Sequence, residues 1–305
     1  MKLKFDVEGR TSPDPFIFED NGRFYLYVTA HDGVEAYEAD SPFGIWHFRG
    51  VVAVFGDGVN YWAPSVIKHD GKYYMYVSCE KKGEFEYLYV ACAEDPLGPF
   101  TNEKRLFDHF SIDSHVVETE AGMFLWYAKD NLTRDKVGTR VYLDRLIDPY
   151  TPAYEPREVL LPEFDEEKFT PQCTPERDWY TIEGPFWFQE GQWQYVMYSG
   201  GCFQDDTYHI GYGAAKTTEP DLMKVDYVKH VSENGFAPVI IKNEYEEGTG
   251  HHSVLKLNGE YYAVYHGRDW AEKNGDGYDE RRNARICRLH VADGIITAER
   301  YEDHI

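Results

Sequence analysis

Apolar runs recur along this chain in pairs, and a short turn containing glycine separates the two members of each pair. One pair covers residues 185–188 and 193–198, with a tight turn at residues 190–191 between them. Aromatic residues dominate both runs, and such residues are enriched in β-strands. The pattern therefore predicts a strand, a turn and a returning strand, which together form a β-hairpin.

The same hairpin occurs five times, and each copy has a residue at the matching point just before its first apolar run. Repeats of this kind are typical of a β-propeller, in which antiparallel sheets called blades surround a central channel. We therefore predict an all-β fold, a five-bladed β-propeller, in which residues 1–305 form a single domain. Six or seven blades would also fit the length, but no further repeats support them. The five matching residues are Asp14, Ala63, Asp113, Glu183 and His251.

The matching residues indicate where the chemistry of this protein lies, because four of the five are ionisable. The first strands of propeller blades line the channel, so we expect these side chains to meet at one of its mouths. Carboxyl groups that face one another across a pocket can serve as general acid and general base. Asp14 alone, between two prolines, would be interpreted as a turn residue, but its match with Asp113 and Glu183 favours a functional role.

Three further side chains are candidates for substrate binding. Trp62, beside Ala63, has a ring on which a sugar could stack, or it belongs to the core. His115 would point to the same strand face as Asp113, where it could contact a substrate or simply hold a hydrogen bond. Arg268 follows the last hairpin and could orient a carboxylate or a hydroxyl group, or lie on the surface.

Three other stretches have simpler interpretations. Residues 80–86 are charged and predict a solvated turn. Residues 151–181 contain several prolines and an acidic run, which indicate a long loop between blades. Polar and apolar residues alternate over residues 280–291 well enough to predict the closing outer strands, with the arginines on a solvated edge.

Composition and charge exclude several functions. The formal net charge of −23 at pH 7 argues against nucleic acid or an anionic membrane surface as a partner. The N-terminus lacks the apolar core of a signal peptide, and no stretch is long enough to span a bilayer. Five cysteines without a Cys-x-x-Cys pair are most simply reduced thiols. We therefore expect a cytoplasmic protein, although a cleaved leader missing from this chain would leave the same pattern, and the oligomeric state is not indicated.

Two adjacent histidines suggest a transition-metal site at first sight. Adjacent strand residues face opposite sides of a sheet, however, so His251 and His252 are not expected to bind one ion together. No His-x-x-x-His motif or Cys/His cluster predicts a zinc site, and nothing predicts an organic cofactor. The hairpin register places His251, rather than His252, in the channel.

Five short motifs in this order and spacing make the chain similar to glycoside hydrolase family 43, the five-bladed propeller glycosidases of clan F. The resemblance covers nearly the whole chain. It departs from the pattern of many members at Ser65, where those members have Asp. The motifs are Asp14-Pro15, Tyr61-Trp62-Ala63-Pro64, Ile112-Asp113-Ser114, Glu183-Gly184-Pro185 and Gly250-His251-His252-Ser253.

The resemblance implies a role for each ionisable residue at the matching points. Asp14 would be the general base, Glu183 the general acid, and Asp113 the residue that modulates the pKa of the acid and orients it. Hydrolysis with inversion at the sugar needs a protonated carboxyl at the leaving oxygen and an ionised one on the opposite ring face. His251 would lie beside one calcium ion in the central channel, held largely by water.

The resemblance also implies the class of substrate, which is pentose-containing plant polysaccharides or their oligomers. We expect an inverting exo-glycosidase that releases terminal pentose from arabinose- or xylose-containing oligosaccharides, most simply an α-L-arabinofuranosidase. A β-xylosidase or a bifunctional enzyme is the main alternative, ahead of an endo-arabinanase or a galactanase. The non-enzyme alternative is a sugar-binding propeller that has lost catalysis, but such a protein should have lost at least one of the three acids.

Overall fold

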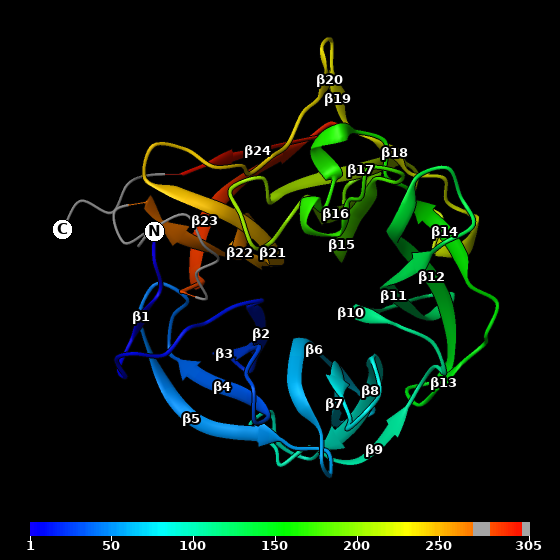
Figure 1. The fold of residues 1–305 in the computed structure, drawn as a ribbon. Helices are drawn as coiled ribbons and strands as arrows, with labels where there is room; N and C mark the ends of the chain where they lie inside the picture. Colours follow the sequence, from blue (N-terminus) through cyan, green and yellow to red (C-terminus); the bar gives the residue numbers. More distant parts are fainter. Residues whose placement is uncertain (271–280, 301–305) are drawn as a thin grey trace.

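The computed structural model describes residues 1–270 and 281–300, whose regular structure is almost entirely β-strand. The strands follow one another around a ring, so that the blue start of the chain lies beside its orange and red end (Figure 1). Each unit of the ring begins with a hairpin, and its later strands are added antiparallel at one side. The predicted all-β propeller is confirmed.

Units one and two are simple sheets in which each strand pairs antiparallel with the next in the chain. A short N-terminal strand adds in parallel to the last strand of unit one. Unit one contains β1 (Lys4–Phe5), β2 (Phe16–Asp20), β3 (Arg23–Val28), β4 (Val34–Ala39) and β5 (Ile45–Ala53), and unit two contains β6 (Val59–His69), β7 (Lys72–Glu80), β8 (Glu86–Ala93) and β9 (Thr101–Arg105).

Units three and four are more irregular, because the segments between their strands form extra elements. Unit three contains β10 (Ile112–Thr119), β11 (Gly122–Asn131), β12 (Val137–Asp148), β13 (Thr151–Pro152) and β14 (Arg157–Leu160), and unit four contains β15 (Trp179–Glu190), β16 (Trp193–Gly200), β17 (His209–Lys216) and β18 (Val228–Lys229). The two units share one larger sheet, since β12 pairs in parallel with the start of β15. Beyond β18, β19 (Val231–Ser232) and β20 (Gly235–Phe236) form a hairpin that projects from the ring (Figure 1).

The prediction of one long loop over residues 151–181 was wrong. Both β13 and β14 pair with β12, so β14 forms an outer strand of unit three. Two short 3-10 helices, η1 (Asp165–Glu167) and η2 (Thr170–Gln172), then precede β15, and η3 (Leu222–Lys224) lies between β17 and β18. Within the described ranges, no helix has the length and apolar character that a membrane span needs.

Unit five closes the ring, and it contains β21 (Glu246–Leu257), β22 (Glu260–Asp269), β23 (Asn283–Ala292) and β24 (Ile295–Glu299). The backbone N–H of Leu3 donates to Ala284, and that of Ile286 donates to Met1, so the first residues of the chain are joined to β23. Because β1 also pairs with β5, the N-terminal segment bridges units five and one. Residues from opposite ends of the chain thereby lie side by side.

Five hydrophobic clusters fill the spaces between neighbouring units in the described chain, and each takes its residues from two units. One cluster contains Tyr27 of unit one and Met75 of unit two, while another contains Ile17 of unit one and Val264 of unit five. Burial of apolar surface is the main favourable contribution to folding. Since the clusters run in a closed cycle, every unit supports two neighbours, and the residues near the axis are held in place.

The hairpins themselves are encoded by local turn chemistry. Asn21-Gly22, Asp70-Gly71 and Asn258-Gly259 each connect two paired strands, and both residues of each turn have positive φ. Two consecutive residues with positive φ define the type I′ turn, for which Asn-Gly and Asp-Gly are the preferred sequences. The alternation of apolar residues on either side of these turns then decides which face of each strand packs against a neighbouring unit.

Candidate active site

The five units present matching residues toward the channel, but the match in unit four differs from the sequence prediction. In unit four the positive φ falls on Gly184, at 57°, one residue after Glu183. Gly184 is also the residue seven places before the first turn residue, Gly191, as in the other units. Glu183 therefore lies one position ahead of the matching point, which corrects the predicted register. The remaining units have positive φ, between 40° and 58°, at Asp14, Ala63, Asp113 and His251.

This offset decides where the Glu183 side chain lies. Successive residues of a strand point to opposite sides, so Gly184 faces the narrow channel and Glu183 does not. Glu183 instead lines the pocket at the mouth of the channel, together with Trp62 and Ile112, which hold the equivalent positions in units two and three. The acid therefore gains access to a space large enough for a ligand.

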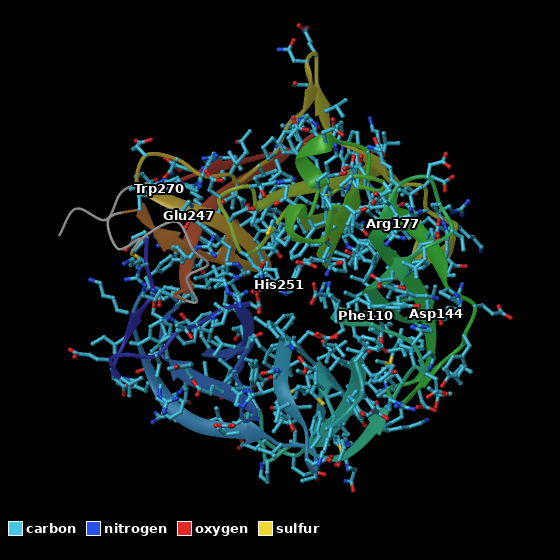
Figure 2. The ribbon with its side chains drawn as sticks, in the orientation of Figure 1. Phe110, Asp144, Arg177, Glu247, His251 and Trp270 are labelled. Atoms are coloured by element: carbon cyan, nitrogen blue, oxygen red, sulfur yellow. The ribbon has the colours of Figure 1, made fainter. Side chains whose placement is uncertain are left out.

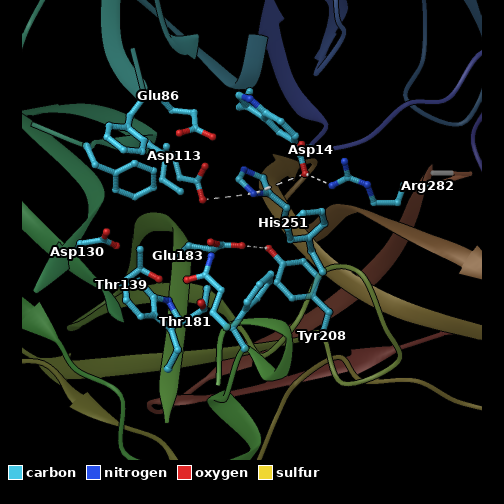
Figure 3. A pocket seen from close by; sticks show the side chains of 18 residues that line it. Asp14, Glu86, Asp113, Asp130, Thr139, Thr181, Glu183, Tyr208, His251 and Arg282 are labelled. Atoms are coloured by element: carbon cyan, nitrogen blue, oxygen red, sulfur yellow. Dashed lines mark hydrogen bonds and ion pairs between the residues drawn. The ribbon is translucent and has the colours of Figure 1, made fainter. Parts of the chain in front are cut away.

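This pocket has a volume of about 510 Å³, within the roughly 300–1,000 Å³ that is usual for ligand sites. Asp14, Asp113 and Glu183 all line it, so the structure brings together the three acids named from the sequence (Figure 3). Aromatic rings cover much of the remaining wall, and they belong to Trp62, Phe85, Phe110, Phe169, Trp179, Phe203 and Tyr208. Carboxyl groups surrounded by aromatic rings suit a polyhydroxylated ligand with apolar ring faces.

Asp14 is buried beside one arginine and two histidines. Arg282 Nη1 and His266 Nδ1 each lie 3.1 Å from Asp14 Oδ1, and the Thr29 hydroxyl donates to Oδ2 at 2.7 Å. Burial alone would raise the pKa of Asp14, but the charge of Arg282, helped by the contacts with His251 and His266, holds this pKa well below its usual range. Asp14 is therefore an ionised carboxylate at neutral pH.

Glu183 has the opposite electrostatic environment. Its Oε1 accepts a hydrogen bond of 2.7 Å from the hydroxyl of Tyr208, which is buried. Burial raises the pKa of Glu183 to about 7; the hydrogen bond from Tyr208 opposes this shift, and the negative charge of Asp14 adds to it. A carboxyl with a pKa near neutrality is suited to donate a proton as a general acid.

Asp113 is coupled to Glu183 through charge and through the backbone. Its Oδ2 accepts a hydrogen bond of 3.0 Å from the N–H of Gly184, the residue after Glu183. Burial raises the pKa of Asp113 well above its ordinary value, and the charges of Glu183 and Asp14 raise this pKa further. Two neighbouring carboxyls resist ionising together, so this pair holds a proton jointly and titrates as a unit.

His251 lies near the centre of the ring (Figure 2), between the two aspartates. Its Nδ1 is 3.7 Å from Asp14 Oδ1 and 3.7 Å from Asp113 Oδ2 (Figure 3). The backbone N–H of His251 donates to Ser199 Oγ at 2.8 Å, which fixes the strand to unit four. Burial lowers the pKa of His251, so the neutral ring separates the two carboxyl groups without a charge of its own.

The channel beneath His251 does not offer a calcium cage. Calcium prefers six to eight oxygen ligands, whereas the described residues contain no group of three or more His, Cys, Asp or Glu side chains able to hold a metal ion. Pro15, Phe16 and Phe186 are among the residues that line this channel, and its volume is about 10 Å³, roughly the room that one water molecule needs. The described residues therefore offer no cage of protein ligands for calcium, and an ion held largely by water stays a prediction.

Of the remaining predicted site residues, Trp62 lines the pocket and His115 does not. His115 is buried; its Nδ1 accepts a hydrogen bond of 3.0 Å from the N–H of Trp187, and its ring stacks on Phe186 with centroids 3.9 Å apart. The structure thus favours the alternative that His115 is a hydrogen-bonded strand histidine. Its bond joins unit three to unit four.

Arg268 is buried, so its interpretation as a surface arginine was wrong. It orients a carboxylate, but one of the protein, and it is not among the described residues that line the pocket. Its Nε lies 2.7 Å from Oε1 of Glu247, which is farther from the ring centre (Figure 2). The guanidinium also donates to the backbone carbonyls of Phe203 and Asp205, at 2.8 and 2.9 Å. Arg268 therefore holds the segment that carries Phe203 into the pocket.

The sequence interpretation missed two residues that touch the catalytic acids, Tyr208 and Arg282. The predicted solvated edge of residues 280–291, of which residue 280 lies outside the described residues, is wrong for Arg282 and Arg285, which are 2% and 4% exposed. Arg282 reaches Asp14 because the ring closes beside β23. Arg282 directly precedes β23 and Tyr208 precedes β17, so both lie outside the hairpin repeats and no repeat pattern pointed to them.

Comparisons with known proteins agree with this fold. A family model described as Glycosyl hydrolases family 43 matches residues 7–296. An extracellular exo-α-(1→5)-L-arabinofuranosidase of Streptomyces avermitilis is 24% identical over 92% of this chain, which spans 60% of that relative's length. A xylosidase/arabinosidase of Bacteroides ovatus is 24% identical over 97% of both proteins. The crystal structure of a thermostable family-43 glycoside hydrolase has a TM-score of 0.83 and 25% identity, and the match covers 99% of this chain and 97% of that one. The chain therefore belongs to family 43 of the glycosyl hydrolases.

Proposed function

We propose that this protein is an inverting exo-glycosidase that releases terminal pentose from arabinose- or xylose-containing oligosaccharides, most simply as an α-L-arabinofuranosidase. One observation carries the proposal, namely the opposite environments of two carboxyl groups in a single pocket. Positive charge lowers the pKa of Asp14 despite its burial, whereas burial raises the pKa of Glu183. The family match supports hydrolysis of glycosidic bonds, for which inversion is general in this family.

In this mechanism Asp14 and Glu183 act on opposite faces of one sugar ring. Asp14 accepts a proton from a water molecule while the water oxygen forms a bond to the anomeric carbon. Glu183 gives its proton to the glycosidic oxygen as the bond between that oxygen and the anomeric carbon breaks. One water molecule is consumed, the anomeric configuration inverts, and the two carboxyl groups exchange protons with solvent before the next turnover.

Asp113 and Tyr208 act through Glu183. The carboxyl of Asp113 accepts from the N–H of Gly184 and thereby fixes the backbone next to the acid. Its negative charge, when present, discourages ionisation of Glu183. The Tyr208 hydroxyl holds one carboxyl oxygen of Glu183, which leaves the other free to face the glycosidic oxygen. Asp113 and Tyr208 are therefore positioning residues.

The choice of sugar rests on the relatives and on the pocket wall. The Streptomyces avermitilis relative is named an exo-arabinofuranosidase, and Trp62 supplies an aromatic surface on which a sugar ring can stack. A β-xylosidase, or an enzyme with both activities, is the second candidate, because a relative that matches over 97% of both proteins is named a xylosidase/arabinosidase.

Hydrolysis of an aryl α-L-arabinofuranoside and an aryl β-D-xyloside, measured side by side, tests the substrate, and we expect the arabinofuranoside to react faster. Proton NMR of the first-formed sugar should show the inverted anomer, and retention would contradict the mechanism. Asp14→Asn and Glu183→Gln should each lower kcat by about 10² to 10⁴-fold, while Asp70→Asn, in an exposed turn, serves as the control. Oligosaccharide binding without release of product would support the sugar-binding alternative.

Two expectations from the sequence stay predictions. A structural calcium ion would show itself as a lower Tm after chelation, and an unchanged Tm would count against it. Cytoplasmic location is tested by fractionating cells of the source organism, since the Streptomyces avermitilis relative is named extracellular.

A further inference from the structure

One wall of the pocket carries polar side chains for which the hydrolytic mechanism has no use. The turn predicted over residues 80–86 is largely exposed, but Glu86 at its end is partly buried and lines the pocket. Asp130 of β11 pairs across the sheet with Thr139 of β12, and both also line the pocket. The close-up shows Glu86, Asp130 and Thr139 around the same cavity as the catalytic acids (Figure 3).

These side chains have no side-chain partners in the described part of the chain. No hydrogen bond or ion pair in the described ranges joins the carboxyl group of Glu86 or Asp130 to another side chain. Thr139 is 5% exposed, and its Oγ1 has no hydrogen-bond partner among the described residues. Buried polar groups nearly always have hydrogen-bond partners. A buried threonine hydroxyl without one, beside two carboxyl groups that no side chain pairs with, indicates that a ligand supplies the hydrogen bonds.

Asp130 and Thr139 of this wall lie on the far side of Glu183 from Arg282, the ion-pair partner of Asp14 (Figure 3). Burial raises the pKa of Glu183, and the charge of Asp130 adds to this shift. Burial also raises the pKa of Asp130, to about 6, and the charge of Glu86 adds to that shift. The main neighbours of Asp14 are instead Arg282 and two histidines. Figure 3 agrees, with Asp130 and Arg282 on opposite sides of Glu183.

The inverting mechanism indicates which part of the substrate lies on this side of Glu183. In an inverting reaction the water approaches from the side of the base, and the leaving oxygen lies beside the acid. The sugar unit whose anomeric carbon is attacked by water therefore lies on the side of the base, Asp14. The space beyond Glu183, away from Asp14, therefore receives the sugar unit that leaves.

We propose that Glu86, Asp130 and Thr139 form the binding site for the leaving sugar and recognise its hydroxyl groups. This inference rests on the proposed function. The ligand that it names is a neutral, polyhydroxylated sugar unit on the leaving side of the scissile bond, rather than a small aryl group or an acidic sugar.

The chemistry of the three side chains fits such a ligand. Each carboxylate oxygen accepts hydrogen bonds, and a threonine hydroxyl both donates and accepts, so adjacent sugar hydroxyls can be held at once. Hydrogen bonds to a charged acceptor are stronger than neutral ones. A uronic acid in the same place would bring a third negative charge against Glu86 and Asp130, and like charges repel. Phe85 and Phe110, which also line the pocket, can cover the apolar faces of the ring.

Three variants test the inference, namely Glu86→Ala, Asp130→Ala and Thr139→Val. For each, kcat/KM is measured with a neutral pentose disaccharide or trisaccharide and with an aryl pentoside whose leaving group has no hydroxyl. Loss of a hydrogen bond to a charged group predicts about ten-fold or more loss of kcat/KM on the oligosaccharide for the two carboxylate variants. On the aryl pentoside we expect a change within about two-fold for Glu86→Ala and Thr139→Val. Because the charge of Asp130 contributes to the pKa of Glu183, Asp130→Ala is compared with the wild-type protein at the pH optimum of each. Glu84→Ala removes a nearby exposed carboxylate outside the pocket and is the matched control.

The outcomes separate this inference from the proposed function. A selective loss on the oligosaccharide, with Tm unchanged, supports the leaving-sugar site. Equal losses on both substrates, or no loss on the oligosaccharide in the carboxylate variants, overturn it while leaving the glycosidase assignment intact. Wild-type protein that hydrolyses neither substrate overturns the proposed function, and this inference with it. Thr139→Val keeps the shape of the side chain, so a loss in that variant reports the hydroxyl rather than the fold.

Discussion

Replacing Tyr208 by phenylalanine tests the electrostatic account of the acid, because the change removes one oxygen and keeps the ring. The hydroxyl donates to Glu183 Oε1 at 2.7 Å within a buried site. A hydrogen bond to a charged group contributes about 1.5–3 kcal/mol, and one pKa unit corresponds to about 1.36 kcal/mol. A protonated carboxyl keeps part of this bond through its carbonyl oxygen, so we expect the pKa of Glu183 to rise by about one unit in Tyr208→Phe.

The direction of this change is visible in the pH dependence of activity. Glu183 must be protonated to act as the acid, so activity is lost as the pH rises through its pKa of about 7. A higher pKa keeps the proton on Glu183 to higher pH, and the alkaline limb of kcat/KM should move upward by about one pH unit. Initial rates with an aryl pentoside, recorded from about pH 5 to about pH 10, locate this limb, which reports the coupled Asp113–Glu183 pair.

Tyr265 provides a matched control for this experiment. Its hydroxyl donates to Glu246 Oε1 at 3.0 Å, and both side chains are buried in unit five, away from the residues that line the pocket. Tyr265→Phe should therefore leave the alkaline limb unchanged, although it also removes a hydrogen bond from a tyrosine to a carboxylate. If the limb of Tyr208→Phe stays in place or moves to lower pH while Tm is preserved, the assigned role of the Tyr208 hydroxyl is refuted.

Three further perturbations test other contacts. Arg282→Met removes the cation that lies 3.1 Å from Asp14 Oδ1, so the pKa of Asp14 should rise. Because Asp14 must be ionised to act as the base, the acid limb of kcat/KM should move to higher pH. An unchanged acid limb would contradict the assignment of Asp14 as the base. Glu167→Gln leaves the buried ammonium group of Lys229, 2.6 Å away and 1% exposed, without its counter-charge. Urea unfolding should show a loss of about 3–5 kcal/mol in the free energy of unfolding. Wild-type stability in this variant would argue against the ion pair. Arg268→Met releases two backbone carbonyls of the segment that carries Phe203 into the pocket. The kcat should fall in this variant and be partly restored in Arg268→Lys. Equal kcat in the wild-type protein and both variants would show that Arg268 has no positioning role.

The amino-acid sequence determined the hairpins and the position of two of the acids. Turn residues such as Asn21-Gly22 and the apolar runs beside them act over short distances along the chain, so each hairpin is encoded locally. The register of Asp14 and Asp113 relative to their turns is fixed by hairpin geometry, and both could be placed at the channel from sequence. Side chains of a strand alternate with a period of two, so an error of one residue changes the predicted face. This is what happened at Glu183, because the turn of unit four begins at Gly191 rather than one residue earlier.

Only the tertiary structure decided which groups surround each acid. Arg282 lies beside Asp14 because the N-terminal segment pairs with β23 and closes the ring, and Tyr208 reaches Glu183 from the segment between β16 and β17. Contacts between such distant segments depend on how whole units pack, and no local pattern of residues encodes them. The pKa values of the three acids follow from burial and from charges that several units contribute. The proposed division of Asp14 and Glu183 into base and acid therefore depends on the closed ring, in which neighbours from both ends of the chain are fixed around one pocket.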